Sequence, residues 1–332
     1  MNDSNASLRI AIATDLHYTK DPSGNISVQV CAKGTQNDPM QMLLELLESP
    51  EAPFESRADI LICPGDITTS ACEESFERGW SDLQKLQKTV GASHLIAATG
   101  NHEIVSRVTK DHHIAGNSEI AAAPFEYLIN LEGYPAVLDQ ADKKWIYWGR
   151  GYEAVSGDDW VVVTINTCHF HGTLLANEYE RGRIGESALA DLRENLLDLS
   201  EKFAFRVVVL HHPPISHEEF GISLGRVPMW NGDLLVKAVE ETGKDWMIIH
   251  GHKHLHRLVR SSGTEYAPIV FGAASFGALL TGEVSNQTKN QFYILELSFR
   301  EIAGEYRLRG KLDTLCWDGQ RWDLSMRTIH GL

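Results

Sequence analysis

Short apolar runs rich in Val and Ile recur along the chain, and polar residues follow each of them. These runs are Leu8–Thr14, Asp59–Cys63, Leu95–Thr99, Trp160–Ile165, Phe205–Leu210, Trp246–Ile249 and Ile269–Ala273. Runs of this length, bounded by turn residues, predict strands that are buried on both faces of a sheet.

Segments with the residue spacing of helices lie between the predicted strands. They are Pro39–Glu48, Cys72–Val90, Gly185–Lys202 and Leu234–Glu241. In the third segment the leucines recur at helical spacing, which predicts a stripe that faces the core. Strands that alternate with helices predict an α/β fold with a largely parallel or mixed sheet.

The C-terminal part of the chain has a different pattern. Gln291–Phe299 and Gly304–Lys311 alternate apolar with polar residues, as the strands of an antiparallel hairpin do. The chain shows no internal repeat and no Pro/Gly-rich linker. We therefore expect residues 1–332 to form a single domain, in which residues 257–332 complete the sheet or cap the site.

Composition and charge narrow the classes of partner. Of the 332 residues, 43% are hydrophobic and 23% are charged, as in an ordinary soluble globular protein. The formal net charge is −15 and no basic run occurs. Proteins that follow a nucleic-acid backbone generally carry basic stripes, so the charge argues against a long nucleic acid as partner. A small anionic substrate would need positive charge from another source, such as bound metal ions.

The sequence predicts a cytoplasmic protein that does not enter membranes. Met1–Ser7 is polar and lacks the apolar core of a signal peptide. No segment approaches the roughly 20 apolar residues that span a bilayer. The five cysteines are scattered and form no C-x-x-C pair, a pattern that suits a reducing compartment and argues against a disulfide framework or a structural zinc site.

Side chains with metal-binding chemistry follow five of the predicted strands. The sequences at these strand ends are Asp15-Leu16-His17, Pro64-Gly65-Asp66, Gly100-Asn101-His102-Glu103, His211-His212-Pro213-Pro214 and His250-Gly251-His252-Lys253-His254. In open α/β sheets, ligands bind at the carboxyl edge of the strands. We therefore expect Asp, Asn and His side chains to meet at one such edge.

These side chains predict a binuclear metal site. Imidazole with carboxylate and amide oxygen suits Mn, Fe, Zn, Co or Ni better than Mg or Ca. The motifs hold more ligands than one ion needs. Two ions about 3.5–4 Å apart, bridged by a carboxylate, form a clamp for in-line attack on phosphorus, and a water between them loses a proton near neutral pH.

Asp-x-His or Gly-Asp alone is a common chance pattern, but here all the motifs occur in one order, each after an apolar strand. The series D-x-H, G-D, G-N-H-E, H and G-H-x-H resembles the calcineurin-like metallophosphoesterase superfamily over residues 8 to about 256. The resemblance implies a four-layer α/β/β/α sandwich of two mixed sheets flanked by helices. It also implies one metal ion on Asp15, His17 and His254, a second on Asn101, His211 and His252, and Asp66 as the bridging ligand. His102 would lie beside the substrate, as general acid or as a cation that stabilises the transition state.

The sequence contains several histidines besides those assigned to the two ions. In the H-x-P pattern of the family the first His is the ligand, which favours His211 over His212. His169 and His171 follow the strand Trp160–Ile165, near the same rim, and are candidate substrate contacts. Arg181 and Arg183 are expected to be solvated. Five further histidines are expected to be core or surface residues without a role in the site; they are His112, His113, His217, His250 and His256.

The pattern is most similar to the small bacterial-type cyclic-nucleotide phosphodiesterases, which share H-H-P-P. It departs from them between His17 and Asp59 and in the tail after Ala274. No Tyr follows Asp66, which disfavours the purple acid phosphatases. The resemblance therefore implies a phosphodiesterase acting on a cyclic nucleotide or a similar small diester. The alternatives are a phosphomonoesterase on nucleotides or phosphoproteins, a nuclease, and a non-catalytic binding or regulatory module; the complete ligand set argues against the last.

Overall fold

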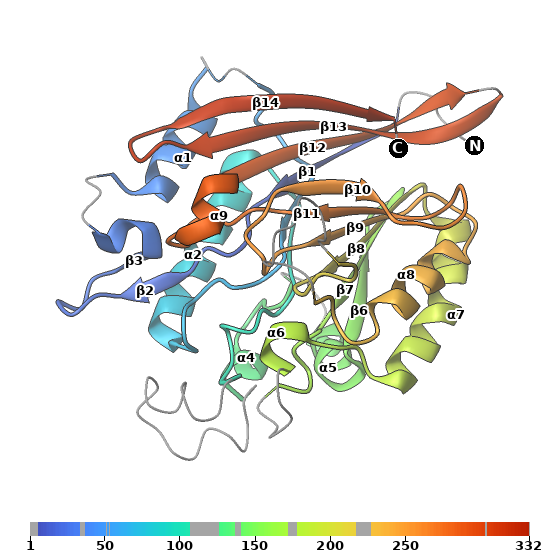
Figure 1. The fold of residues 1–332 in the computed structure, drawn as a ribbon, viewed down its shortest axis with the longest axis horizontal. Coiled ribbons are helices and arrows are strands. Elements are labelled where there is room, and N and C mark those ends of the chain that lie inside the picture. Colours follow the sequence, from blue (N-terminus) through green and yellow to red (C-terminus); the bar gives the residue numbers. More distant parts are fainter. Residues whose placement is uncertain are drawn as a thin grey trace.

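The computed structural model describes residues 6–33, 37–50, 52, 54–106, 126–136, 141–171, 178–216, 227–302 and 304–331. Two six-stranded mixed sheets form the centre of the molecule (Figure 1). The first has the order β14-β13-β12-β1-β4-β5, and the second has the order β10-β11-β9-β8-β7-β6. A small hairpin pairs β2 (Tyr18–Lys20) with β3 (Ile26–Val28).

The strands of the first sheet are β1 (Ser7–Ile12), β4 (Ile60–Cys63), β5 (His94–Ala97), β12 (Gln291–Ile302), β13 (Glu305–Trp317) and β14 (Trp322–Gly331). The strands of the second are β6 (Tyr152–Ser156), β7 (Trp160–Ile165), β8 (Phe205–Leu210), β9 (Met247–His250), β10 (Arg257–Arg260) and β11 (Ile269–Gly272). β1, β4 and β5 run parallel to one another, as do β7, β8, β9 and β11. The seven apolar runs therefore form strands as predicted, with ends shifted by at most two residues.

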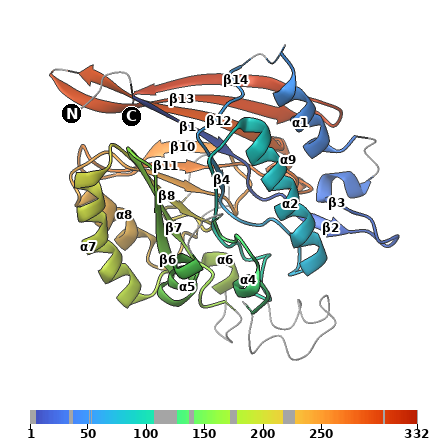
Figure 2. The ribbon, with the colours of Figure 1, turned by 180° about the vertical axis from the view of Figure 1, so that it is seen from behind.

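Helices flank the two sheets on opposite sides. α1 (Pro39–Glu48) and α2 (Glu73–Val90) cover the first sheet, and α7 (Glu186–Lys202) and α8 (Gly232–Glu240) cover the second (Figures 1 and 2). All four helices occupy their predicted segments. The short remaining helices are η1 (Gln29–Lys33), α4 (Glu126–Asn130), α5 (Ala141–Arg150), α6 (Glu178–Arg181) and α9 (Gly282–Gln287).

Three separate hydrophobic clusters hold these four layers together. Leu61 packs toward α1 and α2 in the first cluster, whereas its neighbours Ile60 and Ile62 pack between the two sheets in the second. The third cluster joins Val163 on the second sheet to Leu192 on α7. Adjacent strand residues point to opposite faces, so burial on both faces requires the continuous apolar runs seen in the sequence. The architecture is the expected four-layer α/β/β/α sandwich.

The C-terminal strands extend the first sheet. β12 pairs antiparallel with β1 and with β13, so the predicted hairpin is confirmed. A third long strand, β14, pairs antiparallel with β13 at the edge of the sheet and was not predicted, because its alternating apolar positions, Trp322, Leu324 and Met326, span only five residues. Trp322 at its start donates its indole N–H to the carbonyl of Pro39, 2.7 Å away. The tail and the segment between His17 and Asp59 therefore pack on each other.

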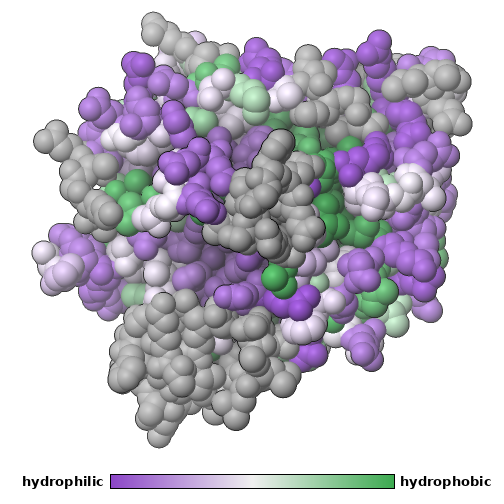
Figure 3. All heavy atoms as spheres, in the orientation of Figure 1, coloured by the Kyte–Doolittle hydropathy of each residue, from purple (hydrophilic) through white to green (hydrophobic). Residues whose placement is uncertain are grey.

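The molecular surface is mainly hydrophilic on the face shown in Figure 3, with small separate hydrophobic patches. The long strands β12–β14 lie on the opposite side of the molecule from α4, α5 and α6 (Figures 1 and 2). None of the described helices is long and apolar enough to cross a membrane.

Candidate metal centre

The predicted ligands come from both sheets. Asp15 and His17 follow β1, and Asp66 and Asn101 follow β4 and β5 of the first sheet. His211, His252 and His254 follow β8 and β9 of the second sheet. Asp15, Asp66 and His211 are each at most 1% exposed. The site therefore lies where the carboxyl ends of strands from the two sheets meet, as the order of the motifs predicts.

One group of donor atoms converges around Asp15. His254 Nε2 lies 3.2 Å from Asp15 Oδ1 and 3.2 Å from His17 Nε2. His17 Nε2 lies 3.7 Å from Asp66 Oδ2. Metal–ligand bonds of about 2.0–2.2 Å place neighbouring ligand atoms roughly 3.0–3.5 Å apart in tetrahedral or octahedral shells. These four side chains fit one metal ion, and their donor atoms all lie within 4.8 Å of one another.

A second group forms a triangle of three donor atoms. His211 Nε2 and His252 Nδ1 each lie 3.0 Å from Asn101 Oδ1 and 3.2 Å from each other. The far nitrogens of both rings face carbonyl oxygens: His211 Nδ1 donates to Pro64 and His252 Nε2 donates to Glu180, each over 2.9 Å. Both far nitrogens therefore carry protons, and in the neutral rings the near nitrogens present lone pairs. Three lone pairs that meet when both rings are neutral fit a second cation.

Asp66 connects the two groups. Its Oδ2 lies 3.3 Å from His211 Nε2 in the second group and 3.7 Å from His17 Nε2 in the first. Its Oδ1 accepts the backbone N–H of His102 over 2.9 Å. One carboxylate oxygen that faces both groups has the position required of a bridging ligand.

Burial and the two aspartates control the protonation of these histidines. Burial lowers the pKa of His17 to about 3, against the opposing effect of Asp66. Burial also lowers the pKa of His252. Burial alone would lower the pKa of His211 as well, but Asp66 raises it to about 9. The aspartates thus stabilise positive charge at the centre, whether a proton or a metal ion carries it.

The backbone at the ligands adopts an uncommon conformation. Five of the seven predicted ligands have positive φ values: Asp15 (51°), His17 (52°), Asp66 (55°), His252 (72°) and His254 (56°). Residues other than Gly occupy this left-handed region at an energetic cost, and such residues cluster at functional sites. Asp and His tolerate it better than branched residues, so the ligand types also suit these turns.

Two glycines allow the loops to approach the carboxylates. A Cβ at Gly100 would collide with Asp66 Oδ1, and a Cβ at Gly251 would collide with Asp15 Oδ2. Glycine is required at both positions because the backbone touches the ligand oxygens.

Glu103 organises the loop that carries Asp66. Its position in the G-N-H-E motif marked it as part of the site, but the sequence did not indicate this role. Its carboxylate is 5% exposed and accepts four backbone N–H groups. The donors are Asp66 (2.9 Å), Ile67 (2.5 Å), Thr68 (3.2 Å) and Gly100 (2.5 Å). Glu103 therefore ties the β4 loop to the β5 loop and positions the bridging aspartate.

His102 lies at the edge of the ligand groups. Its ring packs edge-on against His17, with the centroids 4.9 Å apart, and it is half-buried. The ring therefore adjoins the first group while part of the side chain remains open to solvent. This place is compatible with the predicted contact to a substrate.

His171 and His169 occupy different environments. His171 is 3% exposed, and its Nδ1 lies 3.0 Å from Ser106 Oγ. Ser106 Oγ donates its only proton to the carbonyl of Asn101 over 2.6 Å, so His171 Nδ1 donates to Ser106. His171 thus lies behind a ligand rather than on an open surface. His169 is half-buried and packs edge-on against Phe170, 5.0 Å away.

A third cluster of possible ligands adjoins the centre. Cys168, His171 and His212 are buried, and one donor atom from each lies within 4.8 Å of the others. The thiol of Cys168 points to the carbonyl of Thr99 over 3.2 Å, and burial raises its pKa well above the ordinary value. A protonated thiol is a poor metal ligand, so we assign no ion to this cluster.

The other residues singled out from the sequence have varied positions. Arg181 stacks on Trp230, its Cζ 3.6 Å from the ring centroid, and Arg183 stacks on Phe170 at 4.0 Å. Both arginines are therefore engaged with aromatic rings rather than simply solvated. The rest are histidines outside the two ligand groups. His250 is buried, His256 packs beside Tyr293, and His112, His113 and His217 lie outside the described residues.

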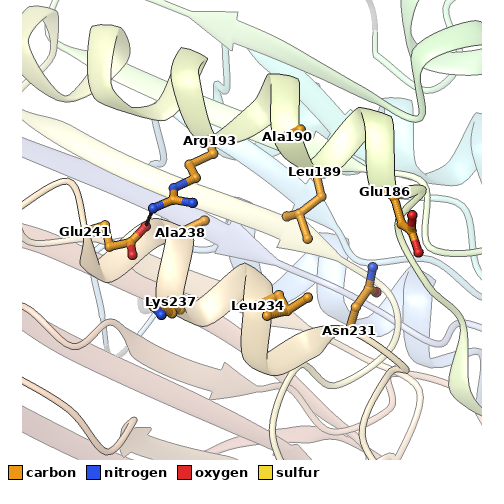
Figure 4. Close-up of a pocket in the computed structure, with 9 residues that line it drawn as sticks. All are labelled: Glu186, Leu189, Ala190, Arg193, Asn231, Leu234, Lys237, Ala238 and Glu241. Carbon is orange, nitrogen blue, oxygen red and sulfur yellow. Dashed lines mark ion pairs between the residues drawn. The ribbon is translucent and has the colours of Figure 1, made fainter.

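A groove of about 350 Å³ lies between α7 and α8 (Figure 4). Leu189, Ala190 and Leu234 supply apolar lining, and Arg193 pairs with Glu241 across it. None of its lining residues is a predicted site residue, and none belongs to a cluster of metal-binding side chains found among the described residues. The chemistry therefore belongs to the strand ends and not to this groove.

Comparison with solved structures finds a similar fold in a dimetal phosphatase from Danio rerio. The two are 9% identical, with a TM-score of 0.54, and the match covers 97% of this chain and 98% of that chain. A cold-active protein-tyrosine phosphatase from a psychrophilic Shewanella species is 14% identical, and the match covers 97% of this chain and 80% of that chain. Its TM-score of 0.33 does not establish a shared fold.

No curated protein matches the chain. Comparison with protein families matches residues 8–256 to the calcineurin-like phosphoesterases, so the match includes all five ligand-bearing strand ends. The chain belongs to the calcineurin-like phosphoesterase family and is a hydrolase of phosphoric esters.

Proposed function

We propose that this protein is a two-metal phosphodiesterase that hydrolyses a small diester, such as a cyclic nucleotide. The observation that carries the proposal is the position of Asp66 Oδ2, which faces both His17 (3.7 Å) and His211 (3.3 Å). This single oxygen joins two groups of donors that each fit an ion. Such a pair of sites suits in-line displacement at phosphorus.

The residues have distinct proposed roles. Asp15, His17 and His254 hold one ion, Asn101, His211 and His252 hold the other, and Asp66 is shared. Bound there, the ions supply an activated water and neutralise the charge of the phosphate. His102, half-buried beside His17, is proposed to give a proton to the leaving oxygen or to stabilise charge on the phosphate. Glu103 and Ser106 position ligands and do not touch the substrate.

The metal identity remains among Mn, Fe, Zn, Co and Ni, since these donors suit all five. We also propose a cytoplasmic location, which is supported by five cysteines that all lie within the described residues and outside any disulfide. Fractionation of cells that express the tagged protein tests the location, and recovery in an exported fraction would exclude it.

The alternative reaction is phosphomonoester hydrolysis. The structural neighbour from Danio rerio is described as a dimetal phosphatase, which favours this alternative. The similarity of H-H-P-P and of the motif order to cyclic-nucleotide phosphodiesterases favours the diester. The two substrates differ in the number of ester groups on phosphorus and therefore in the charge of the phosphate, so turnover of aryl esters that share one leaving group separates the two reactions.

The test uses metal-stripped protein reconstituted with Mn²⁺. Turnover of bis-p-nitrophenyl phosphate, cyclic nucleotides, p-nitrophenyl phosphate and single-stranded DNA is compared at equal enzyme concentration. We expect metal-dependent turnover that is fastest on small diesters. A strong preference for p-nitrophenyl phosphate would replace the diesterase by the phosphomonoesterase, and a preference for DNA would replace it by a nuclease. Metal binding without any turnover would indicate a non-catalytic module.

A further inference from the structure

An exposed tryptophan packs on the segment that contacts the predicted ligand His252. Trp230, just before α8, is 53% exposed, which is unusual for so large an aromatic side chain. The guanidinium of Arg181 covers one face of its ring at 3.6 Å from the centroid. A cation on one face holds the ring by a cation–π interaction while more than half of the side chain still meets solvent.

The stacked pair is held in place by backbone contacts. Trp230 donates its backbone N–H to the carbonyl of Gly182 over 3.1 Å, and Arg181 Nε donates to the carbonyl of Pro228 over 3.1 Å. The side-chain amide of Asn231 accepts the N–H of Ile184 (3.2 Å) and donates to its carbonyl (2.6 Å). The ring is therefore presented in a fixed pose, so that little entropy would be lost on binding a ligand.

The same segment touches the candidate metal centre. Glu180 accepts the Nε2–H of the ligand His252, and the Cα of Gly182 packs so closely on His212 that a Cβ there would collide with the ring. Arg181 lies between these two residues, and consecutive Cα atoms are about 3.8 Å apart. The backbone of Arg181 is thus only one residue away from a contact with the ligand His252 and from a contact with His212, which is adjacent in sequence to the ligand His211.

We propose that Arg181 and Trp230 form a stacking platform for the planar base of a nucleotide whose phosphate lies at the metal centre. This proposal rests on the proposed function, since it names the substrate class of the same site. Aromatic rings bind bases through their π-faces with little sequence preference, and Trp230 has one face covered by Arg181 and more than half of its side chain in contact with solvent. The charge of Arg181 also favours an anionic ligand in a chain whose formal net charge is −15.

The test measures binding rather than turnover. Isothermal titration calorimetry on the Mn²⁺-loaded protein compares adenosine monophosphate with ribose 5-phosphate, which has the phosphate and sugar but no base. Stacking of one base predicts that adenosine monophosphate binds more tightly by a factor on the order of 5 to 150. Trp230→Ala should reduce this ratio to about 1, whereas Trp230→Phe, which keeps an aromatic face, should retain most of it.

Leu234→Ala is the matched control, because Leu234 is also apolar and 51% exposed but lines the groove between α7 and α8. It should leave the ratio unchanged. Any of three results would overturn the platform. The wild-type protein could bind adenosine monophosphate and ribose 5-phosphate with equal affinity, it could fail to bind adenosine monophosphate, or Trp230→Ala could leave the ratio of the two affinities unchanged. The protein could instead prefer monoesters in turnover while the affinity ratio of adenosine monophosphate to ribose 5-phosphate still depends on Trp230. That result would exclude the proposed reaction and keep the stacking platform, so the two failures are distinguishable.

Discussion

Replacing Glu103 by Gln tests how far one buried carboxylate shapes the metal centre. Oε2 accepts the N–H groups of Asp66 and Gly100, and Oε1 accepts those of Ile67 and Thr68. Glutamine has nearly the same shape, but an NH₂ replaces one of the oxygens. Two of the four backbone N–H groups would then face another donor.

The cost follows from these contacts. A buried N–H that loses its acceptor costs about 1–3 kcal/mol, so two of them cost roughly 2–6 kcal/mol. Part of this cost is offset, because burial and the proximity of Asp66 raise the pKa of Glu103 to about 8, and an amide avoids the cost of ionising a group at this position. We therefore expect Glu103→Gln to lower the free energy of unfolding by about 2–4 kcal/mol. Displacement of the Asp66 loop should also weaken metal binding by roughly 10- to 100-fold.

Guanidinium unfolding followed by circular dichroism measures the stability, on protein kept free of metal so that bound ions do not contribute. Calorimetric titration with Mn²⁺ measures the affinity separately. Glu74→Gln is the control, since Glu74 is 61% exposed in its pair with Lys20, and such surface pairs contribute about 1 kcal/mol or less. A variant at Glu103 with wild-type stability and wild-type affinity would refute the reasoning.

Two further predictions concern the centre and its support, and a third concerns Asp82 on α2. Asp66→Ala should abolish turnover and leave fewer than two Mn²⁺ ions per chain by elemental analysis; full activity would exclude the bridging role. Ser106→Ala should weaken Mn²⁺ binding by roughly tenfold or more, because the carbonyl of Asn101 loses its donor, and unchanged calorimetric affinity would contradict this. Although burial opposes it, the hydrogen bond from Lys85 helps to keep the pKa of Asp82 below its usual value. That carboxylate stabilises the fold above its unfolded pKa of about 3.9 and ceases to do so as the pH falls. The difference in melting temperature between wild type and Asp82→Asn should therefore narrow below about pH 4, and a constant difference from pH 7 to 3 would count against it.

The sequence was most informative where a single local pattern determines the structure. Strands buried on both faces need continuous apolar runs, and Trp160–Ile165 and Phe205–Leu210 form strands with the predicted ends. The sequence predicted that the ligand side chains meet, because parallel strands bring their carboxyl ends to one edge of a sheet. The family resemblance, and not this rule, placed His17 and His254 at one ion, since they follow strands of two different sheets and lie 237 positions apart in the chain.

Features that depend on tertiary contacts could not be predicted from the sequence. In β14 only Trp322, Leu324 and Met326 alternate with polar residues, and this short pattern does not show that the strand pairs with β13 at the edge of the sheet. Glu103 was visible as part of a motif, but its four backbone partners depend on how two loops meet. Trp230 has no local pattern that separates it from a core residue, and only the structure shows Arg181 on its face.

The left-handed backbone at five of the ligands has a consequence for how this site would change under selection. Each of these residues is a poorer choice for folding than Gly, by about 1–2 kcal/mol in the left-handed conformation. The conformational preference of the backbone would therefore favour Gly or Asn at His254, and the need for a metal ligand opposes that exchange. In a lineage that no longer uses the activity, these turns should drift to Gly and Asn before the apolar strands change, so their composition would record whether the enzyme is still in use.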